Sequence, residues 1–261
     1  MRQAIRALGW VTKILWVILL ATIITIAYSA TQISVSVGEA RTTATEQAIT
    51  ISFPVNITNN GLYDLTRLNV TTRIADQNSQ TLANGTTIDQ SVQKDTTATI
   101  TYDISINIPE IISQTNGSLL FKDTTFTVFQ YVSLDYANAI PFSLHANYTM
   151  PWGAPLSNLT VGNPTFQLYN STYSNATVQL QFENQNQYLP VNGTIGVEIY
   201  NSRQMLKGAG TASIDVQPNT SCDAQVDFLV RNFRSSTPSG EIYVFFETSA
   251  FDYGPVVISF G

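Results

Sequence analysis

The feature that most constrains this chain is a two-residue hydrophobic period that recurs in short runs after residue 31. Apolar side chains occupy every second position, as at Ile49, Ile51 and Phe53, and turn-forming residues separate the runs. Successive side chains of a β-strand point to opposite faces, so this period buries one face and leaves the other in solvent. Short alternating strands with turns between them are typical of β-sandwiches. We therefore predict an all-β chain after residue 31, with at most a helical turn at 109–114.

The alternating part also repeats itself at an offset of 124 residues. The segment 34–38 (Ser-Val-Ser-Val-Gly) recurs as 158–162 (Asn-Leu-Thr-Val-Gly), and the strand near Ile100 recurs near Ala224. A period of this length indicates two tandem domains rather than a solenoid of small units. We predict immunoglobulin- or fibronectin-III-like sandwiches at 31–150 and 156–261, since each span exceeds the roughly 100 residues that such a fold needs.

A short linker at 151–155 joins the two predicted domains. It contains two prolines and a glycine, which interrupt strands. We expect the large apolar side chain of Trp152 to pack between the domains and to limit their hinge motion. The alternative is an exposed tryptophan on a flexible linker, which is unfavourable for a soluble surface.

The first 30 residues read as a membrane segment. Arg2, Arg6 and Lys13 precede an uncharged apolar run, and no charge follows before Glu39. Residues 10–28 are long enough to cross a bilayer as a helix, with the basic end in the cytoplasm and the remaining chain outside the cell. The alternative is a cleavable signal peptide, with small residues at 27 and 29 before the cleavage point. Both alternatives export the rest of the chain.

Acceptor sequences for N-glycosylation agree with export. Twenty asparagines in a chain with this serine and threonine content would give about four Asn-x-Ser/Thr triplets by chance, and the sequence has ten. We predict that several of them carry glycans. The ten candidates are Asn56, Asn69, Asn84, Asn116, Asn147, Asn158, Asn170, Asn175, Asn192 and Asn219.

The composition argues against most kinds of chemistry. The chain is only 11% charged, has a net charge of −6, and contains one histidine, His145, and one cysteine, Cys222. One histidine and one cysteine cannot form a His/Cys metal cluster, a disulfide framework or a triad with its usual partners. Scattered basic residues and the lack of a glycine-rich phosphate loop argue against nucleic-acid and nucleotide binding.

The carboxylates offer little more. Asp223 and Asp227 alternate along one predicted strand, which is the minimum that paired-carboxylate catalysis or a cation site would need. Asp135 and Asp252 each precede a tyrosine, and we expect both to cap turns. We predict no catalytic residue, no cofactor and no metal site.

The first domain resembles a known family through residues 51–108. The block consists of segments 53–61, 65–70, 74–76, 82–85, 94–95 and 100–108, and a weaker match covers 178–184, 195–199 and 206–208. It is similar to the late-embryogenesis-abundant group 2 domain, also called the water-stress-and-hypersensitive-response domain, in an archaeal-type surface protein. The resemblance implies a fibronectin-III-like sandwich behind a membrane segment and a desiccation-related role. It brings no catalytic residues.

Together these patterns predict a single-pass, N-glycosylated surface protein that acts as a non-enzymatic binding or spacer module of the cell envelope. Its partners would be the bilayer, through residues 10–28, and envelope proteins or glycans. The alternative is a secreted subunit of a surface filament or lattice, in which the freed strand at 31–37 completes a neighbour's sheet. An enzyme has no residue constellation behind it.

Overall fold

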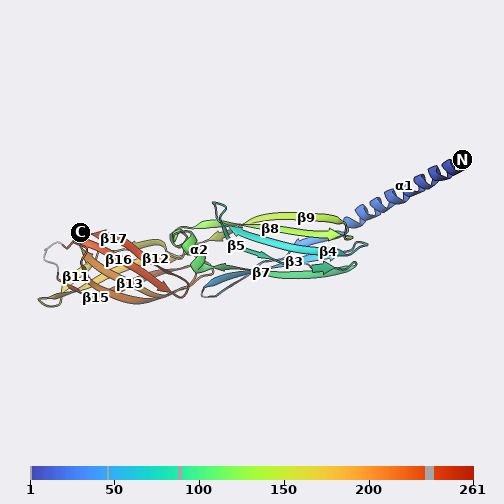
Figure 1. Cartoon of the computed structure of the whole chain (residues 1–261). Coiled ribbons are helices and arrows are strands. Elements are labelled where there is room, and N and C mark those ends of the chain that lie inside the picture. The colour runs from blue at the N-terminus through green and yellow to red at the C-terminus, as the bar shows by residue number, and fades with distance from the viewer. Residues whose placement is uncertain (1, 46, 88–89, 233–237) are drawn as a thin grey trace.

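The computed structural model describes residues 2–45, 47–87, 90–232 and 238–261. Figure 1 shows a rod: helix α1 (Arg2–Ala30) projects from one end, two β-sandwiches follow end to end, and the C-terminus lies near the far end. The predicted all-β fold of two tandem sandwiches behind an apolar helix is confirmed. Each sandwich is built from two antiparallel sheets.

The described residues of the first sandwich form nine strands. Its first sheet has β3 in the middle, β7 on one side, and β1 and β2 in line on the other. Its second sheet has the order β5-β4-β8-β9, and β6 also pairs with β4. The bounds are β1 Ile33–Val37, β2 Arg41–Ala44, β3 Ala48–Asn59, β4 Leu65–Ala75, β5 Thr81–Thr86, β6 Gln90–Val92, β7 Thr96–Asn107, β8 Thr124–Tyr136 and β9 Ile140–Trp152.

The second sandwich repeats this arrangement, with eight strands in the part that the structure describes. In its first sheet β12 lies between β15 on one side and β10 and β11 on the other, and its second sheet has the order β14-β13-β16-β17. The bounds are β10 Ser157–Val161, β11 Thr165–Leu168, β12 Tyr173–Asn184, β13 Val191–Asn201, β14 Leu206–Val216, β15 Thr220–Arg231, β16 Gly240–Thr248 and β17 Asp252–Phe260. Strands β7 and β15 begin 124 residues apart, which is the offset of the sequence repeat.

The two-residue period accounts for the cores. Along β3 buried and half-buried residues alternate from end to end, with Ile51, Phe53 and Val55 at most 2% exposed. Pro54 lies in this central strand, where a missing N–H usually breaks a ladder. It faces the gap between β1 and β2, and the Gly38 N–H donates to the Pro54 carbonyl at 2.8 Å. The break in the outer strand therefore accommodates the proline.

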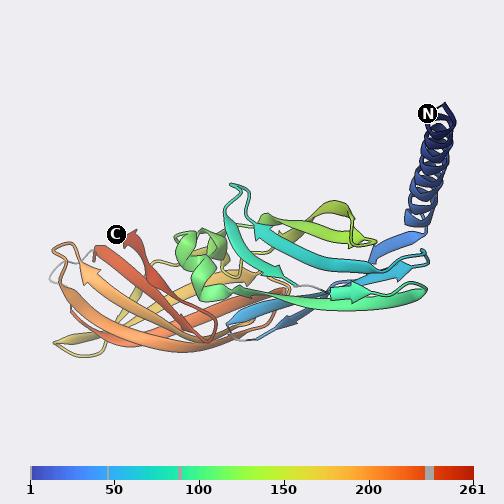
Figure 2. The same cartoon turned by 45° about the vertical axis from the view of Figure 1, so that its right-hand side comes forward.

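Two short helices between β7 and β8 lie at the junction of the sandwiches (Figure 2). They are α2 (Ile108–Gln114), where the sequence predicts a helical turn, and α3 (Ser118–Phe121). Asn107 begins α2, because its side-chain oxygen accepts from the Glu110 N–H at 2.9 Å. After α2 the chain reverses through Asn116, which has a positive φ of 49°, and the Gly117 N–H reaches back to the Ile112 carbonyl at 2.8 Å.

The link between the sandwiches is hydrogen-bonded to both of them. Strand β9 continues to Trp152, beyond the predicted boundary at 150, because an edge strand tolerates Pro151. On the first-sandwich side, the Ala154 N–H donates to the Asp123 carboxylate at 2.8 Å. On the second-sandwich side, the Gln185 N–H donates to the Ala154 carbonyl at 3.0 Å. The link is therefore an ordered part of the rod.

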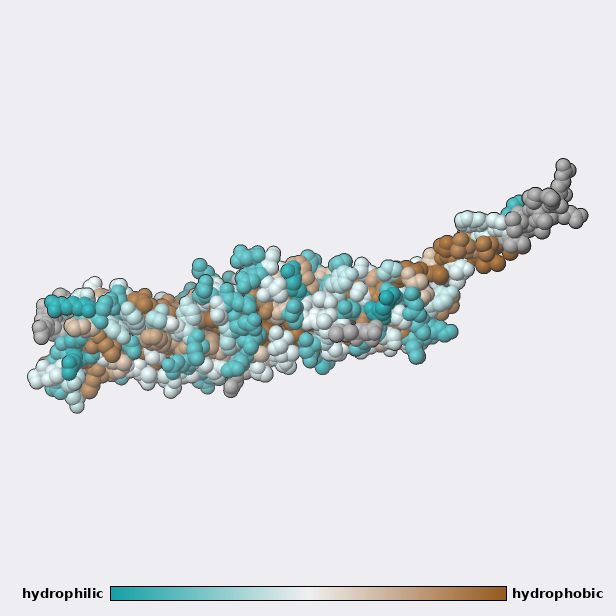
Figure 3. Space-filling model, in the orientation of Figure 1, coloured by the Kyte–Doolittle hydropathy of each residue, from teal (hydrophilic) through white to brown (hydrophobic). Residues whose placement is uncertain are grey.

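Helix α1 contrasts with the rod in surface character. It contains one stretch, Thr12–Ala30, that is long and apolar enough to cross a membrane. At 1.5 Å per residue these 19 residues cover about 28 Å, close to a bilayer core of about 30 Å. Figure 3 shows strongly hydrophobic colour on α1 beside a predominantly pale and hydrophilic rod. Helices of this kind occur both in membrane anchors and in signal sequences.

Candidate functional site

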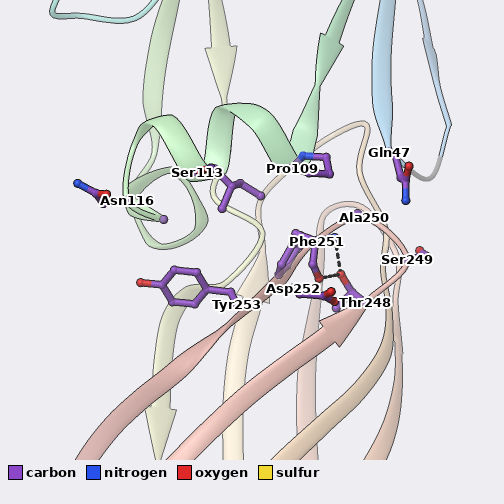
Figure 4. A pocket seen from close by; sticks show the side chains of 12 residues that line it. Gln47, Pro109, Ser113, Asn116, Thr248, Ser249, Ala250, Phe251, Asp252 and Tyr253 are labelled. Atoms are coloured by element: carbon purple, nitrogen blue, oxygen red, sulfur yellow. Dashed lines mark hydrogen bonds between the residues drawn. The ribbon is translucent and has the colours of Figure 1, made fainter.

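A cleft of about 580 Å³ lies at the junction of the two sandwiches. This volume is in the range of small-molecule sites. Three separate parts of the chain line it: the turn before β3, the α2–α3 segment, and the turn from β16 into β17 (Figure 4). The lining residues are Gln47, Pro109, Ile112, Ser113, Asn116, Gly117, Thr248, Ser249, Ala250, Phe251, Asp252 and Tyr253.

The floor of the cleft is a tight turn. The Thr248 hydroxyl accepts from the Phe251 N–H at 2.9 Å and lies 2.5 Å from the Phe251 carbonyl, which also accepts from the Thr248 N–H at 3.0 Å. These bonds, drawn in Figure 4, hold the turn closed and present Asp252 toward solvent. Tyr253 then packs edge-on against Phe121 at a centroid distance of 5.3 Å, which joins β17 to α3.

The polar side chains of the cleft are mostly uncharged hydrogen-bonding groups. Its polar side chains are the amides of Gln47 and Asn116, one exposed carboxylate, Asp252, and the hydroxyls of Ser113, Thr248, Ser249 and Tyr253. Such groups hydrogen-bond an uncharged polar ligand. Paired-carboxylate catalysis needs a second carboxylate within reach of the first, and among the described residues that line the cleft Asp252 is the single carboxylate.

The other candidate residues do not line this cleft. His145 is exposed on β9, with its ring 4.6 Å from the Tyr131 ring. Cys222 is half-buried on β15, and burial raises the pKa of its thiol, an effect to which the charge of Asp223 adds. A raised pKa makes the thiol less nucleophilic near neutral pH.

The paired carboxylates do not converge. Asp223 and Asp227 are both exposed on the outer face of β15, four residues apart, or about 13 Å along a strand. Carboxylate pairs in glycosidases lie about 5–9.5 Å apart. Asp227 instead accepts from the Thr177 hydroxyl at 2.5 Å and from Gln225 at 2.7 Å, and these hydrogen bonds lower its pKa. In the described residues, no group of three His, Cys, Asp or Glu side chains could hold a metal ion.

The expectation that Asp135 and Asp252 play one turn-capping role in both units is wrong. Asp135 lies near the end of β8 and forms an ion pair with Arg67. Asp252 begins β17, which corresponds to β9 rather than to β8. The local sequence similarity around them therefore joins positions on different strands.

The predicted glycosylation sites differ in accessibility. Six asparagines are exposed: Asn84, Asn116, Asn147, Asn158, Asn170 and Asn219. Asn56, Asn69, Asn175 and Asn192 are half-buried, and the side-chain oxygen of Asn192 is buried without a hydrogen-bond partner. Asn116 lies at the rim of the cleft and points away from Asp252 (Figure 4), so a glycan there would stand beside the opening.

Trp152 is 2% exposed. Its ring packs against Phe126 at 5.4 Å, and its indole N–H donates to the Leu119 carbonyl at 2.9 Å. These contacts lie on the first-sandwich side, and the residues hydrogen-bonded to both sides follow directly after it. A role for Trp152 in limiting hinge motion stays a prediction.

No protein-family model matches the chain, and no curated protein sequence is similar to it. Solved structures align with the chain only at low TM-scores and low identity. A red sea bream transglutaminase aligns over 87% of this chain with a TM-score of 0.33 and 14% identity, and the aligned part is 31% of that enzyme's length. The putative ApaA protein from Bordetella pertussis aligns over 45% of this chain and 91% of its own, with 16% identity and a TM-score of 0.31. The periplasmic chaperone SfaE aligns over 87% and 98%, with 11% identity and a TM-score of 0.28.

Proposed function

We propose that this chain is an exported, membrane-anchored, N-glycosylated β-sandwich protein that acts as a non-enzymatic binding or spacer module of the cell envelope. The observation that carries the proposal is the way α1 joins the rod. An apolar helix of bilayer length passes without a flexible linker into the first sandwich, at the end opposite the C-terminus. The basic residues before the apolar run favour a cytoplasmic amino terminus and extracellular sandwiches.

Ser29 supports retention of the helix. It is 1% exposed, its hydroxyl accepts from the Leu62 N–H at 2.6 Å, and it contacts the Tyr136 hydroxyl inside the first sandwich. Cleavage after Ser29 would remove this side chain and leave the Leu62 N–H without this acceptor. Retention of the helix keeps these contacts and therefore agrees better with the structure of this junction.

The binding part of the proposal rests on the cleft. Its amides, hydroxyls and single carboxylate favour a small polar ligand such as a neutral sugar unit of an envelope glycan. The resemblance to the late-embryogenesis-abundant group 2 domain supports a sandwich displayed behind a membrane segment. It implies no particular ligand for the cleft.

The mature amino terminus tests the anchor. Protein purified from native cells is analysed by intact mass and by peptide sequencing. Peptides from residues 1–28 in the mature chain, together with digestion of the sandwiches by protease added to intact cells, are the expected result. A chain that begins near Ala30 would overturn the anchor, and sandwiches protected in intact cells would overturn the topology.

The alternative function is a secreted filament subunit that donates its first strand. In the structure β1 pairs with β3 of its own sandwich over five residues, from Ile33 opposite Asn59 to Val37 opposite Val55. Strand donation would require this pairing to open. Ordered polymers of the cleaved protein in electron micrographs would favour this alternative.

A further inference from the structure

Strand β9 is an unusually open sheet edge. Among the strands that the structure describes it pairs only with β8, and its nine residues 141–149 are all exposed. Soluble proteins usually protect such edges with charged side chains, bulges or short strands. Here the strand is 13 residues long, and the sequence has no Asp, Glu, Lys or Arg between Asp135 and Glu183. The edge is therefore long, uncharged and accessible.

The inner face of β9 is also uncovered. Phe142, Leu144 and Tyr148 lie opposite buried residues of β8 and so point to the core side, yet they are 40%, 51% and 37% exposed. The corresponding edge of the second sandwich differs, because Val256 and Ile258 of β17 are half-buried and Phe260 is 8% exposed. We call the exposed apolar side chains of Phe142, Leu144 and Tyr148 the ledge. Of the two corresponding edges, only that of the first sandwich has such a ledge beside its unpaired backbone groups.

Two prolines mark the ends of the row of unpaired backbone N–H and C=O groups along β9. Pro141 and Pro151 have no N–H, and an edge strand accommodates proline where the N–H would point away from its neighbour. Backbone groups of an antiparallel strand alternate between the two sides. The odd-numbered residues therefore direct their N–H and C=O groups away from β8, which leaves four outward positions between the prolines: 143, 145, 147 and 149.

These positions are symmetric about Ala146, and we propose that β9 pairs with β9 of a second copy, antiparallel, across a twofold axis at Ala146. In this register Ser143 faces Thr149 and His145 faces Asn147 of the other copy, and each pair can exchange two backbone hydrogen bonds. On the ledge Leu144 meets Tyr148 and Phe142 meets Met150. Pro141 meets Pro151 at both ends, where the ladder stops.

The partner is a second copy because the edge complements itself. An isologous contact requires one surface to match its own rotated image, and this strand does so in apolar side chains, in outward backbone groups and in the position of its prolines. The absence of charge along β9 removes the like-charge repulsion that a self-pairing edge would otherwise meet.

The pairing goes beyond the proposed function and is compatible with it. Figures 1 and 2 both show α1 leaving the rod on the side of β8 and β9. Rotation about an axis normal to the joined sheet keeps both helices on that side of the sheet, at opposite ends of the dimer. The β9 contact does not involve α1, so cleavage of the helix and failure of the dimer are separate outcomes.

Cysteine cross-linking tests the register. The full-length chain, made in a host without N-glycosylation and held in detergent, carries Cys222→Ser so that each new cysteine is alone. In the proposed dimer Ala146 faces its own copy at a non-hydrogen-bonded position, where Cα atoms lie about 4.5 Å apart, and this separation permits a disulfide. Ala146→Cys should give a covalent dimer under mild oxidation.

Offset positions are the controls. Leu144→Cys and Tyr148→Cys should each give no covalent dimer, because identical residues would lie about 13 Å apart along the strands, whereas a mixture of the two should cross-link. Val257→Cys, exposed on β17, reports random collisions. Absence of the Ala146→Cys dimer, or equal yields at 144, 146, 148 and 257, would overturn the proposal.

A proline variant gives a readout without oxidation. His145→Pro removes one outward N–H from each copy and leaves the β8 ladder intact, as Pro141 and Pro151 already do. The dimer dissociation constant, from light scattering across a dilution series, should rise roughly tenfold or more. The melting temperature of the monomer should change little. An unchanged dissociation constant, or a protein that is monomeric at all concentrations, would contradict pairing through β9.

Discussion

Asn59 and Asn184 occupy the same position in the two sandwiches, at the ends of β3 and β12. The Asn59 amide donates to the carbonyls of Tyr63 at 2.9 Å and Val92 at 3.2 Å, and its oxygen accepts from the Gly61 N–H at 3.1 Å. Asn184 repeats the pattern by donating to Leu189 at 2.8 Å and Val216 at 3.4 Å, while its oxygen accepts from the Asn186 N–H at 3.1 Å. Each buried amide thus ties a strand end of one sheet to the opposite sheet.

Removing either amide should destabilise its sandwich. Asn59→Ala or Asn184→Ala leaves buried backbone groups without partners, and we expect the free energy of unfolding to fall by about 2–4 kcal/mol. Urea denaturation measures the loss. Asn60→Ala, at an exposed neighbouring position, is the matched control. Losses no larger than in the control would show that the two amides do not hold the sheets together.

The junction between α1 and the first sandwich should depend on the Ser29 hydroxyl. In Ser29→Ala the Leu62 N–H loses its acceptor, which we expect to cost about 1–2 kcal/mol locally. Hydrogen exchange at the Leu62 amide should accelerate roughly tenfold. Thr31→Ala removes an exposed hydroxyl bonded to the Tyr28 carbonyl and should leave that amide unchanged. Equal exchange in both variants would contradict a rigid junction.

The link between the sandwiches should not tolerate a side chain at Gly153. A Cβ there would lie 1.8 Å from the Gln185 carbonyl oxygen, so Gly153→Ala must push the second sandwich away. We expect faster proteolysis at 153–156 and a changed small-angle scattering profile. At Gly162 the nearest atom would lie 3.5 Å from a Cβ, so Gly162→Ala should behave like the parent. An unaltered profile in Gly153→Ala would contradict the ordered link.

Glycan occupancy should follow accessibility. Asn84 and Asn219 are exposed, whereas the Asn192 side-chain oxygen is buried and a glycan on that side chain would prevent its packing. Glycopeptide mass spectrometry of protein from native cells should find glycans at Asn84 and Asn219 and none at Asn192. A glycan at Asn192 in folded protein would overturn this order.

Stability should fall in alkaline solution. Burial raises the pKa of Tyr102 above its ordinary value of 10.0, although hydrogen bonds with Thr72 and Gln130 act in the opposite direction. The folded state then holds this proton more tightly than the unfolded state, so the stabilisation is complete below about pH 10 and declines as the pH rises further. Urea midpoints at pH 8–11.5 measure the decline, and Tyr102→Phe should make it shallower. An equal slope in both proteins would assign the decline to other tyrosines.

The sequence predicted those features of the fold that depend on residues close together in the chain. The alternation at Ile49, Ile51 and Phe53 reports which side of a strand is buried, and the offset of 124 residues reports that one topology is built twice. The helical turn at 109–114 was also expected, although α3 was not. The prediction that Asp135 and Asp252 have equivalent roles was wrong, because the similar tripeptides around them lie on strands that do not correspond.

The residues of the candidate cleft could not be predicted from the sequence in the same way. Gln47, Ser113 and Asp252 come from three distant connections, and no sequence pattern relates them before the sandwiches are joined. His145 is exposed, as its position in the two-residue alternation predicts. Leu144 is exposed as well, although the alternation places it on the core side of the strand.

By itself the sequence determined the strands, their inward faces, their repetition and the apolar helix, because side-chain periodicity and hydropathy are properties of neighbouring residues. Only the tertiary structure decided which strands became edges, which inward faces were covered, and where the connections met. These outcomes depend on how one sheet is placed over another, so Val256 on β17 is half-buried while Leu144 on β9 is left in solvent.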